Sequence, residues 1–141
     1  MKKLSVEETV QIKVLAVVSY EPQYKIAWLF NQRFGWSLAE SEALSVINKE
    51  RSVMQQFVVF SWNDVENGKT IYLIQNIGAQ GILEPSMRMV DYWLRIENID
   101  DMSSIALDIK KIEGIQLTQE VKPSDLKKNN LVFRNQLYQN E

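Results

Sequence analysis

The chain has 141 residues, of which 45% are hydrophobic and 24% are charged, and its net charge is −2. This composition is typical of one globular domain with a single core, and it excludes the charge-rich, apolar-poor class of disordered proteins. Histidine and cysteine are both absent, which excludes a disulfide framework, thiol catalysis and the residues that dominate zinc sites. A slightly acidic chain also lacks the basic footprint of nucleic-acid-binding domains, so we expect no nucleic-acid partner.

We expect residues 1–141 to form a single domain, with flexible termini at 1–8 and 134–141. Two lysines follow Met1, but Glu7 and Glu8 interrupt the apolar run that a signal peptide requires. No stretch approaches the roughly twenty apolar residues of a membrane span. The lack of cysteine fits a reducing compartment. These features predict a cytoplasmic protein without membrane contact.

The first half of the chain predicts one strand and two helices. Alternating residues over Thr9–Ser19 predict a strand that is apolar on both faces. Pro22 is suited to the first position of a helix with aromatic residues at helical spacing, and Gly35 is suited to its end. The segment Ser37–Glu40 has the form of a capping box, which predicts a second, short helix through about Asn48.

A hairpin and a further strand are predicted in the middle of the chain. The β-branched and aromatic residues of Val53–Trp62 predict one long strand with both faces partly buried. Asn67 and Gly68 form the strongest short-range hairpin signal, so Thr70–Asn76 is the expected returning strand. Met89–Glu97 is expected to be the next strand.

The last part of the chain predicts a helix and a strand. Asp100 or Asp101 is a suitable cap for a helix with inward-facing residues between Met102 and Ile112. Gly114 ends this helix, and alternation over Ile115–Val121 predicts the last strand. A short turn or helix and a polar tail are expected after it.

The resulting order, β-α-(α)-β-β-β-α-β, predicts an α+β fold. We expect one mixed, mainly antiparallel sheet of about five strands with two or three helices, ferredoxin-like in outline. Several strands are apolar on both faces, so one helical layer would leave the far face uncovered. We therefore expect another helix or a partner subunit on that face, which favours a homodimer.

Three patterns imitate ligand sites but predict ordinary turns. Gly68–Thr70 matches the tail of a phosphate-binding loop, yet Asn63 stands where that loop has its first glycine. Gly78–Gly81 has the spelling of an RNA-clamping loop without a basic neighbour. The oxygen-rich segment Asn63–Gly68 has Ile74 where a calcium loop needs its bidentate glutamate. We expect neither a metal nor a cofactor at any of them.

No catalytic residue can be assigned. A serine nucleophile needs a histidine or lysine partner, and no nucleophile motif is present. Carboxylate chemistry remains open, because Glu84, Asp91 and Glu97 could converge and two carboxyl groups suffice for acid–base catalysis.

The most specific motif lies in residues 81–94. It reads Gly-Ile-Leu-Glu-Pro-Ser-Met-Arg-Met-Val-Asp-Tyr-Trp-Leu. The segment resembles the signature of the bacterial IPExxxVDY family, in which Ile-Pro-Glu precedes three free positions and Val-Asp-Tyr. The matching residues are Pro85, Val90, Asp91 and Tyr92, whereas Glu84 and Ser86 replace the family's Ile and Glu.

The resemblance extends over about Val10 to Phe133. Tyr24–Gly35 is similar to the family's Tyr-x-x-x-Trp helix, and Tyr72–Ile74 is also consistent with the family. What the resemblance implies is limited, because no activity, cofactor or partner comes with it.

The strand of this motif offers a candidate binding surface. Asp91, Trp93 and Arg95 alternate, so they should share one face, where an acid, an indole and a guanidinium could bind a ligand. The alternative is a solvated face with cross-strand ion pairing.

Tryptophans occur at binding surfaces as well as in cores. We expect Trp28, on a helical stripe, and Trp62, in an apolar strand, to be core residues. Trp36 and Trp93 are expected to be freer, so the candidate surface comprises Asp91, Trp93, Arg95 and Trp36.

These observations favour a non-enzymatic protein-interaction or assembly module that uses an apolar sheet face or an exposed strand edge. Two alternatives remain open. One is a small-ligand-binding regulatory domain, by analogy with ferredoxin-like layouts, and the other is a carboxylate-dependent hydrolase.

Overall fold

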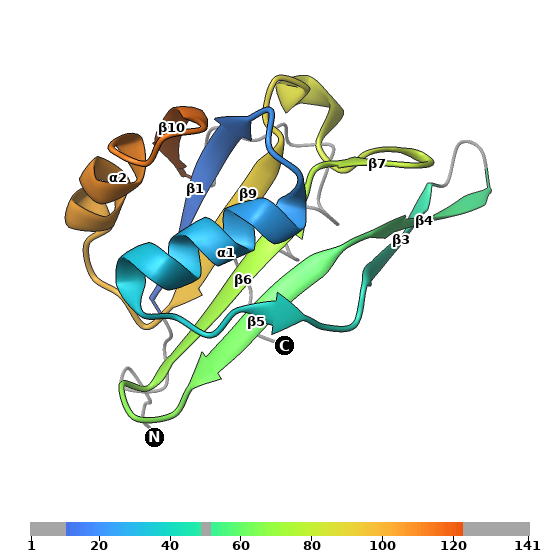
Figure 1. The fold of residues 1–141 in the computed structure, drawn as a ribbon. Coiled ribbons are helices and arrows are strands. Elements are labelled where there is room, and N and C mark those ends of the chain that lie inside the picture. Colours follow the sequence, from blue (N-terminus) through green and yellow to red (C-terminus); the bar gives the residue numbers. More distant parts are fainter. Residues whose placement is uncertain (1–10, 49–51, 123–141) are drawn as a thin grey trace.

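The computed structural model describes residues 11–48 and 52–122 (Figure 1). The predicted flexible termini, 1–8 and 134–141, and the rest of the polar tail lie outside the described residues. In chain order the elements are β1 (Ile12–Ser19), α1 (Gln23–Phe34), β2 (Ala39–Glu40), β3 (Leu44–Asn48), β4 (Val53–Phe57), β5 (Val59–Asp64), β6 (Lys69–Gln75), β7 (Ile77–Gly78), β8 (Gly81–Ile82), the 3-10 turn η2 (Pro85–Met87), β9 (Tyr92–Glu97), α2 (Ser103–Lys110) and β10 (Ile115–Val121).

Six of these strands form one sheet in the order β10-β1-β9-β6-β5-β2, and all of its pairs are antiparallel. Strands β3 and β4 form one small hairpin, and β7 and β8 form another. The prediction of an α+β fold is confirmed. The described sheet is larger than the expected five strands and is antiparallel throughout instead of mixed, and a ferredoxin-like outline is not confirmed.

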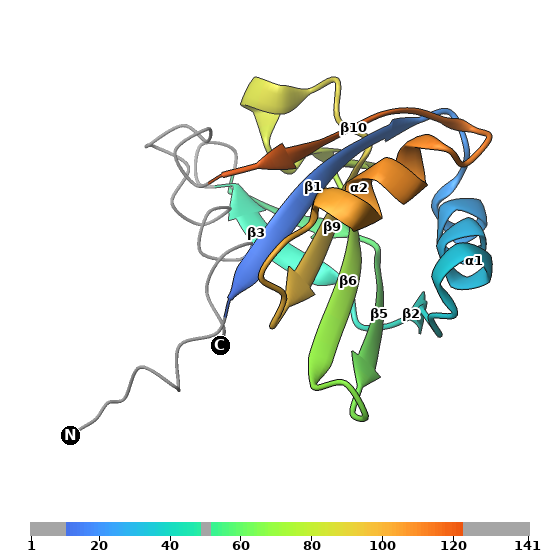
Figure 2. The same cartoon turned by 90° about the vertical axis from the view of Figure 1, so that its left-hand side faces the viewer.

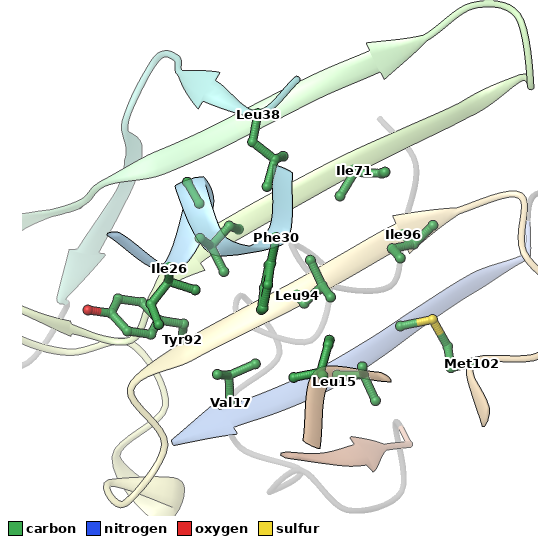
Figure 3. Packing of buried hydrophobic residues seen from close by; sticks show 13 residues of the cluster. Leu15, Val17, Ile26, Phe30, Leu38, Ile71, Tyr92, Leu94, Ile96 and Met102 are labelled. Carbon is green, nitrogen blue, oxygen red and sulfur yellow. The ribbon is translucent and has the colours of Figure 1, made fainter. Parts of the chain in front are cut away.

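Both described helices cover the same face of the sheet (Figures 1 and 2). Leu15 and Val17 of β1 point to this face because side chains alternate along a strand. Figure 3 shows how side chains from the sheet and the helices meet there. The buried residues of this helical-face core are Leu15, Val17, Ile26, Ala27, Phe30, Leu38, Ile71, Leu73, Tyr92, Leu94, Ile96, Met102 and Ile109.

The far face of the sheet carries a second core. Val14 and Ala16 of β1 point to it, and Phe57 of β4 packs there together with Leu83 and Val90 from the segment before β9. The strands are therefore apolar on both sides because the chain covers both sides itself. Over these strands the chain itself supplies cover that the sequence led us to expect from a further helix or a partner subunit.

The predicted helix from Ser37 to Asn48 is absent. Ala39 and Glu40 pair with β5, and β3 pairs with β4. The side chain of Asn31 accepts a hydrogen bond from Leu38 N at 2.9 Å and donates one to Leu38 O at 3.1 Å. The second bond engages the carbonyl of Leu38, which would accept an intrahelical hydrogen bond in a helix over 37–48.

The long strand predicted over Val53–Trp62 is interrupted at Val58. Val58 N donates to the side chain of Gln75 at 3.0 Å, and Gln75 N donates to Val58 O at 2.9 Å. Phe57 and Val59, on either side, both reach the far-face core. The interruption separates β4, which pairs with β3, from β5, which belongs to the large sheet.

The turns and helix ends largely follow the sequence. Helix α1 begins after Pro22 and ends at Gly35, whose φ of 70° and bond from its N–H to Asn31 O form a left-handed cap. The predicted hairpin at Gly68 joins β5 and β6. Before α2, the carboxylate of Asp101 accepts hydrogen bonds from the hydroxyl and N–H of Ser103, which lower the pKa of Asp101.

Candidate functional site

Asp91 lies immediately before β9 and holds the turn between β1 and α1. Its carboxylate accepts a hydrogen bond from Ser19 N at 2.9 Å, and its own N–H donates to Val17 O at 2.9 Å. The hydroxyl of Ser19 continues this network, because it donates to Gly114 O and accepts from Glu21 N. The role of Asp91 in this geometry is to position the turn.

Tyr92 ties the same turn down from the helical face. Its hydroxyl donates to Glu21 O at 2.7 Å. Burial, followed by the negative charges of Asp91 and Glu21, raises the pKa of Tyr92 to about 12. The phenol is therefore neutral at physiological pH and serves as a hydrogen-bond donor.

Trp93 is a core residue, with no exposed surface. Its indole nitrogen donates to the side-chain oxygen of Asn76 at 3.0 Å. Asn76, also fully buried, accepts a second bond from Glu84 N at 3.0 Å and donates to Met87 O and Val90 O at 3.2 and 2.7 Å. The side chain of Asn76 thus binds three points of the segment that precedes β9, as well as the indole.

Arg95 is also buried, with 5% of its surface exposed. Its guanidinium lies 2.7 Å from a carboxylate oxygen of Glu97 and 5.0 Å from the ring centre of Tyr72. A charge removed from water needs such compensation, so these contacts explain why an arginine is tolerated within the sheet.

Three of the four residues predicted to form a binding surface share the β9 region, but they do not form an exposed patch. Trp93 and Arg95 are buried, and the carboxylate of Asp91 is engaged with the backbone of Ser19. Strand β9 therefore presents neither an exposed indole nor an exposed guanidinium to a ligand, as the predicted binding surface would require.

Trp36, the fourth residue, lies apart from them after α1. Its ring stacks on Phe34 at a centroid distance of 4.6 Å and meets Phe30 edge-on at 6.1 Å. It is partly buried against the helical-face core.

Of the two tryptophans predicted to be core residues, only Trp28 proves to be exposed. Trp28, predicted to be a core residue, is 53% exposed, whereas Trp62 is partly buried against the helical-face core. Trp28 belongs to a series of exposed aromatic residues in which Tyr20 is 93% exposed and Tyr24 is 69% exposed. We call Tyr24 and Trp28, which lie one turn apart on α1, the aromatic stripe, whereas Tyr20 lies in the turn before the helix.

The aromatic stripe follows from the spacing of α1. The residues of α1 that are buried are Gln23, Ile26, Ala27 and Phe30, and this series already fills the face toward the sheet. Tyr24 and Trp28, one turn apart, fall outside that series and face solvent. Lys25 lies over the ring of Trp28 at 5.5 Å. The stripe could have been identified from the sequence, by separating Tyr24 and Trp28 from the apolar positions of α1 that face the sheet.

The three carboxylates considered for catalysis are separately engaged. Asp91 binds Ser19 N, Glu97 pairs with Arg95, and the carboxylate of Glu84 accepts a hydrogen bond from the hydroxyl of Ser86. The extended chain from Asp91 to Glu97 spans roughly 20 Å, whereas glycosidase carboxylates stand about 5–9.5 Å apart. Asp91 and Glu97 therefore do not form such a pair.

The patterns that imitate ligand sites lie in hairpins. Gly68–Thr70 belongs to the β5–β6 hairpin, and Gly78 pairs with Gly81 across the β7–β8 turn. Gly81 has a φ of 144°, a backbone conformation that favours glycine, and an added Cβ would also press against the end of the Gln55 side chain. Within residues 11–48 and 52–122, no three acidic side chains gather as a metal site would require.

The described helices include none that is long and apolar enough to cross a membrane. No family model matches the chain, and no similar protein was found among curated sequences or solved structures.

Proposed function

We propose that this protein is a non-enzymatic protein-interaction module that binds its partner through the aromatic stripe on α1. The observation that carries the proposal is the exposure of Tyr24 and Trp28 on the outer side of a helix whose inner side is well packed. Tyrosine and tryptophan are enriched among the residues that dominate binding energy at protein interfaces. The partner would present an apolar surface to these rings.

The residues of the sequence motif support this function indirectly. Asp91 and Tyr92 bind the turn that contains Tyr20 and leads into α1. The segment before β9, which includes Pro85 and Val90, is held by Asn76. Membership of the IPExxxVDY family remains part of the proposal, with the motif acting as a support for α1.

We also propose a cellular location and a more specific description of the fold. One is a cytoplasmic location, which the absence of cysteine favours. The other is a ferredoxin-like outline for the four strands β10-β1-β9-β6 with α1 and α2, to which β5 and β2 would be additions.

The experiment compares the tagged wild-type protein with a Tyr24→Ala, Trp28→Ala double variant in lysate of the source cell. Proteins retained by each are quantified by mass spectrometry. A Leu107→Ala variant is the matched control, because Leu107 of α2 is 58% exposed.

The proposal predicts a protein retained by the wild type and by the control variant at similar levels, and lost at least tenfold from the double variant. Thermal unfolding of all three checks that the fold is retained. Equal recovery by the wild type and a folded double variant would contradict the proposal.

A further inference from the structure

The turn between β5 and β6 contains the step Asn67-Gly68, at the end of the hairpin that these strands form (Figure 1). Residues 65–68 make this turn, and all of them are exposed to solvent. Asparagine is followed by glycine at this one position of the chain. Asparagine side chains are thermally labile, and a following glycine has no side chain to hinder attack by its own nitrogen.

The atoms that would react are accessible in this turn. The nucleophile is the backbone nitrogen of Gly68, and the electrophile is Cγ of Asn67. The N–H of Gly68 donates to Val65 O at 3.3 Å, which is long for a hydrogen bond of this kind. Nothing lies within 4 Å of a Cβ built on Gly68. The space beside this glycine is therefore open to a ring formed from the two residues.

The side-chain amide of Asn67 has a partner that its loss would affect. Asn67 Nδ2 donates to one carboxylate oxygen of Asp64 at 2.8 Å, and Asn67 N donates to the other at 3.4 Å. Asp64 is only 8% exposed. A carboxylate that has lost much of its water depends on such donors for compensation.

We propose that Asn67 is a site of spontaneous deamidation in the folded protein, and that the reaction turns its contact with Asp64 from attraction into repulsion. The nitrogen of Gly68 loses its proton to water and attacks Cγ of Asn67. The new N–Cγ bond closes a five-membered succinimide ring as the Cγ–Nδ2 bond breaks. The leaving nitrogen takes up a proton from water and departs as ammonia.

Water then opens the succinimide and supplies the oxygen of the new carboxylate, so the sequence needs no oxidant or reductant. Cleavage of the N–Cγ bond gives aspartate at position 67. Cleavage of the bond between the nitrogen of Gly68 and the carbonyl carbon of residue 67 gives isoaspartate, in which the main chain runs through Cγ.

Both products should loosen the hairpin. The aspartate product places a carboxylate where the amide now donates to Asp64, and two like charges in contact repel each other. The isoaspartate product adds one carbon to the main chain of the turn, whose length sets the register of β5 against β6.

The test incubates the folded protein at neutral and at mildly alkaline pH and follows the tryptic peptide 52–69 by mass spectrometry. This peptide also contains Asn63, which is exposed but precedes Asp64 instead of glycine, so it is an internal control. We expect Asn67 to be converted at least tenfold faster than Asn63. The rate should be higher at the alkaline pH, because the attacking nitrogen must lose its proton.

Two variants test the chemistry. Gly68→Ala should slow the reaction at least tenfold, because its methyl group hinders the attacking nitrogen. Alanine is strained at the φ of 66° found here, so circular dichroism must show that this variant is folded. Asn67→Gln should leave position 67 unconverted over the same period, since glutamine would have to form a six-membered ring.

A further pair tests the effect on Asp64. Asn67→Asp reproduces the aspartate product and should lower the unfolding temperature by a few degrees. Asn63→Asp is the matched control, because a carboxylate there still accepts the hydrogen bond from the Thr70 hydroxyl. The unfolding temperature of this control should stay close to that of the wild type.

An Asn67 that is stable in the folded protein and reacts only after unfolding in urea would overturn the inference, because the hairpin would then protect it. Equal conversion of Asn63 and Asn67 would overturn it too. Equal unfolding temperatures of Asn67→Asp and the wild type would contradict the repulsion from Asp64. None of these outcomes bears on the proposed role of the aromatic stripe, which lies on α1.

Discussion

Asn76 is the residue on which the segment before β9 depends most. Its buried amide binds Glu84 N, Met87 O and Val90 O, and it also accepts the bond from the indole of Trp93. A buried polar group whose partner is removed costs more than the bond itself contributed, because each group left behind has lost its water.

We therefore expect Asn76→Leu to lower the free energy of unfolding by about 3–5 kcal/mol, since it leaves several buried polar groups unpaired. Urea unfolding measures this loss. Asn63→Leu is the control, because the exposed side chain of Asn63 accepts a long hydrogen bond, of 3.4 Å, from the Thr70 hydroxyl. A similar, small effect of both substitutions would show that Asn76 does not organise this segment.

Tyr92 makes a pH-dependent contribution to stability. Its pKa is about 12 in the folded chain and about 10 in the unfolded chain. Between these values the unfolded chain loses the phenolic proton and the folded chain keeps it, so stability falls as the pH rises through this window. Below pH 10 the contribution is fully present.

The Tyr92→Phe variant removes both the hydrogen bond to Glu21 O and this titration. We expect it to be about 1 kcal/mol less stable than the wild type at neutral pH. Thermal unfolding at successive pH values should show the difference shrinking between pH 10 and pH 12. A difference that stays constant over this window would contradict the assigned pKa.

At the scale of elements, the strands and helices with tight local signals were predictable. The Gly35 cap, the hairpin at Gly68 and the last strand all depend on residues close in sequence. The segment after α1 was not predictable in this way, because Leu38 is held by Asn31 and the following residues pair with β4 and β5. Tertiary pairing overrode the local helix signal at Ser37.

The candidate site was less predictable than the fold. Alternation correctly placed Trp93 and Arg95 on one face of β9, but it could not show that β4 and the segment before β9 cover that face. The indole of Trp93 is buried by residues distant in sequence, such as Phe57. Exposure of Trp28 could have been inferred from the helical spacing of α1, as the two series of apolar positions indicate.

Trp93 on β9 and Trp28 on α1 should contribute very differently to the free energy of unfolding. Trp93→Ala opens a cavity and removes one of the two donors to the side-chain oxygen of Asn76, so we expect a loss of about 3–5 kcal/mol. Trp28→Ala removes a half-exposed ring, so the expected loss is about 1 kcal/mol or less. Urea unfolding of the two variants should separate them clearly, and equal losses would contradict the placement of both rings.

For the molecule as a whole, neither face of the sheet requires a partner to cover it. The helices cover one face and the β4 region covers the other over the described strands. The aromatic stripe on α1 remains open to a partner.

Contact between Trp28 and a protein partner can be tested in the source cell. A photo-crosslinking amino acid is placed at position 28 and, as a control, at position 107, and the crosslinked products are identified. We expect one specific protein joined through position 28 and not through position 107. The same products at both positions, or none at position 28, would contradict it.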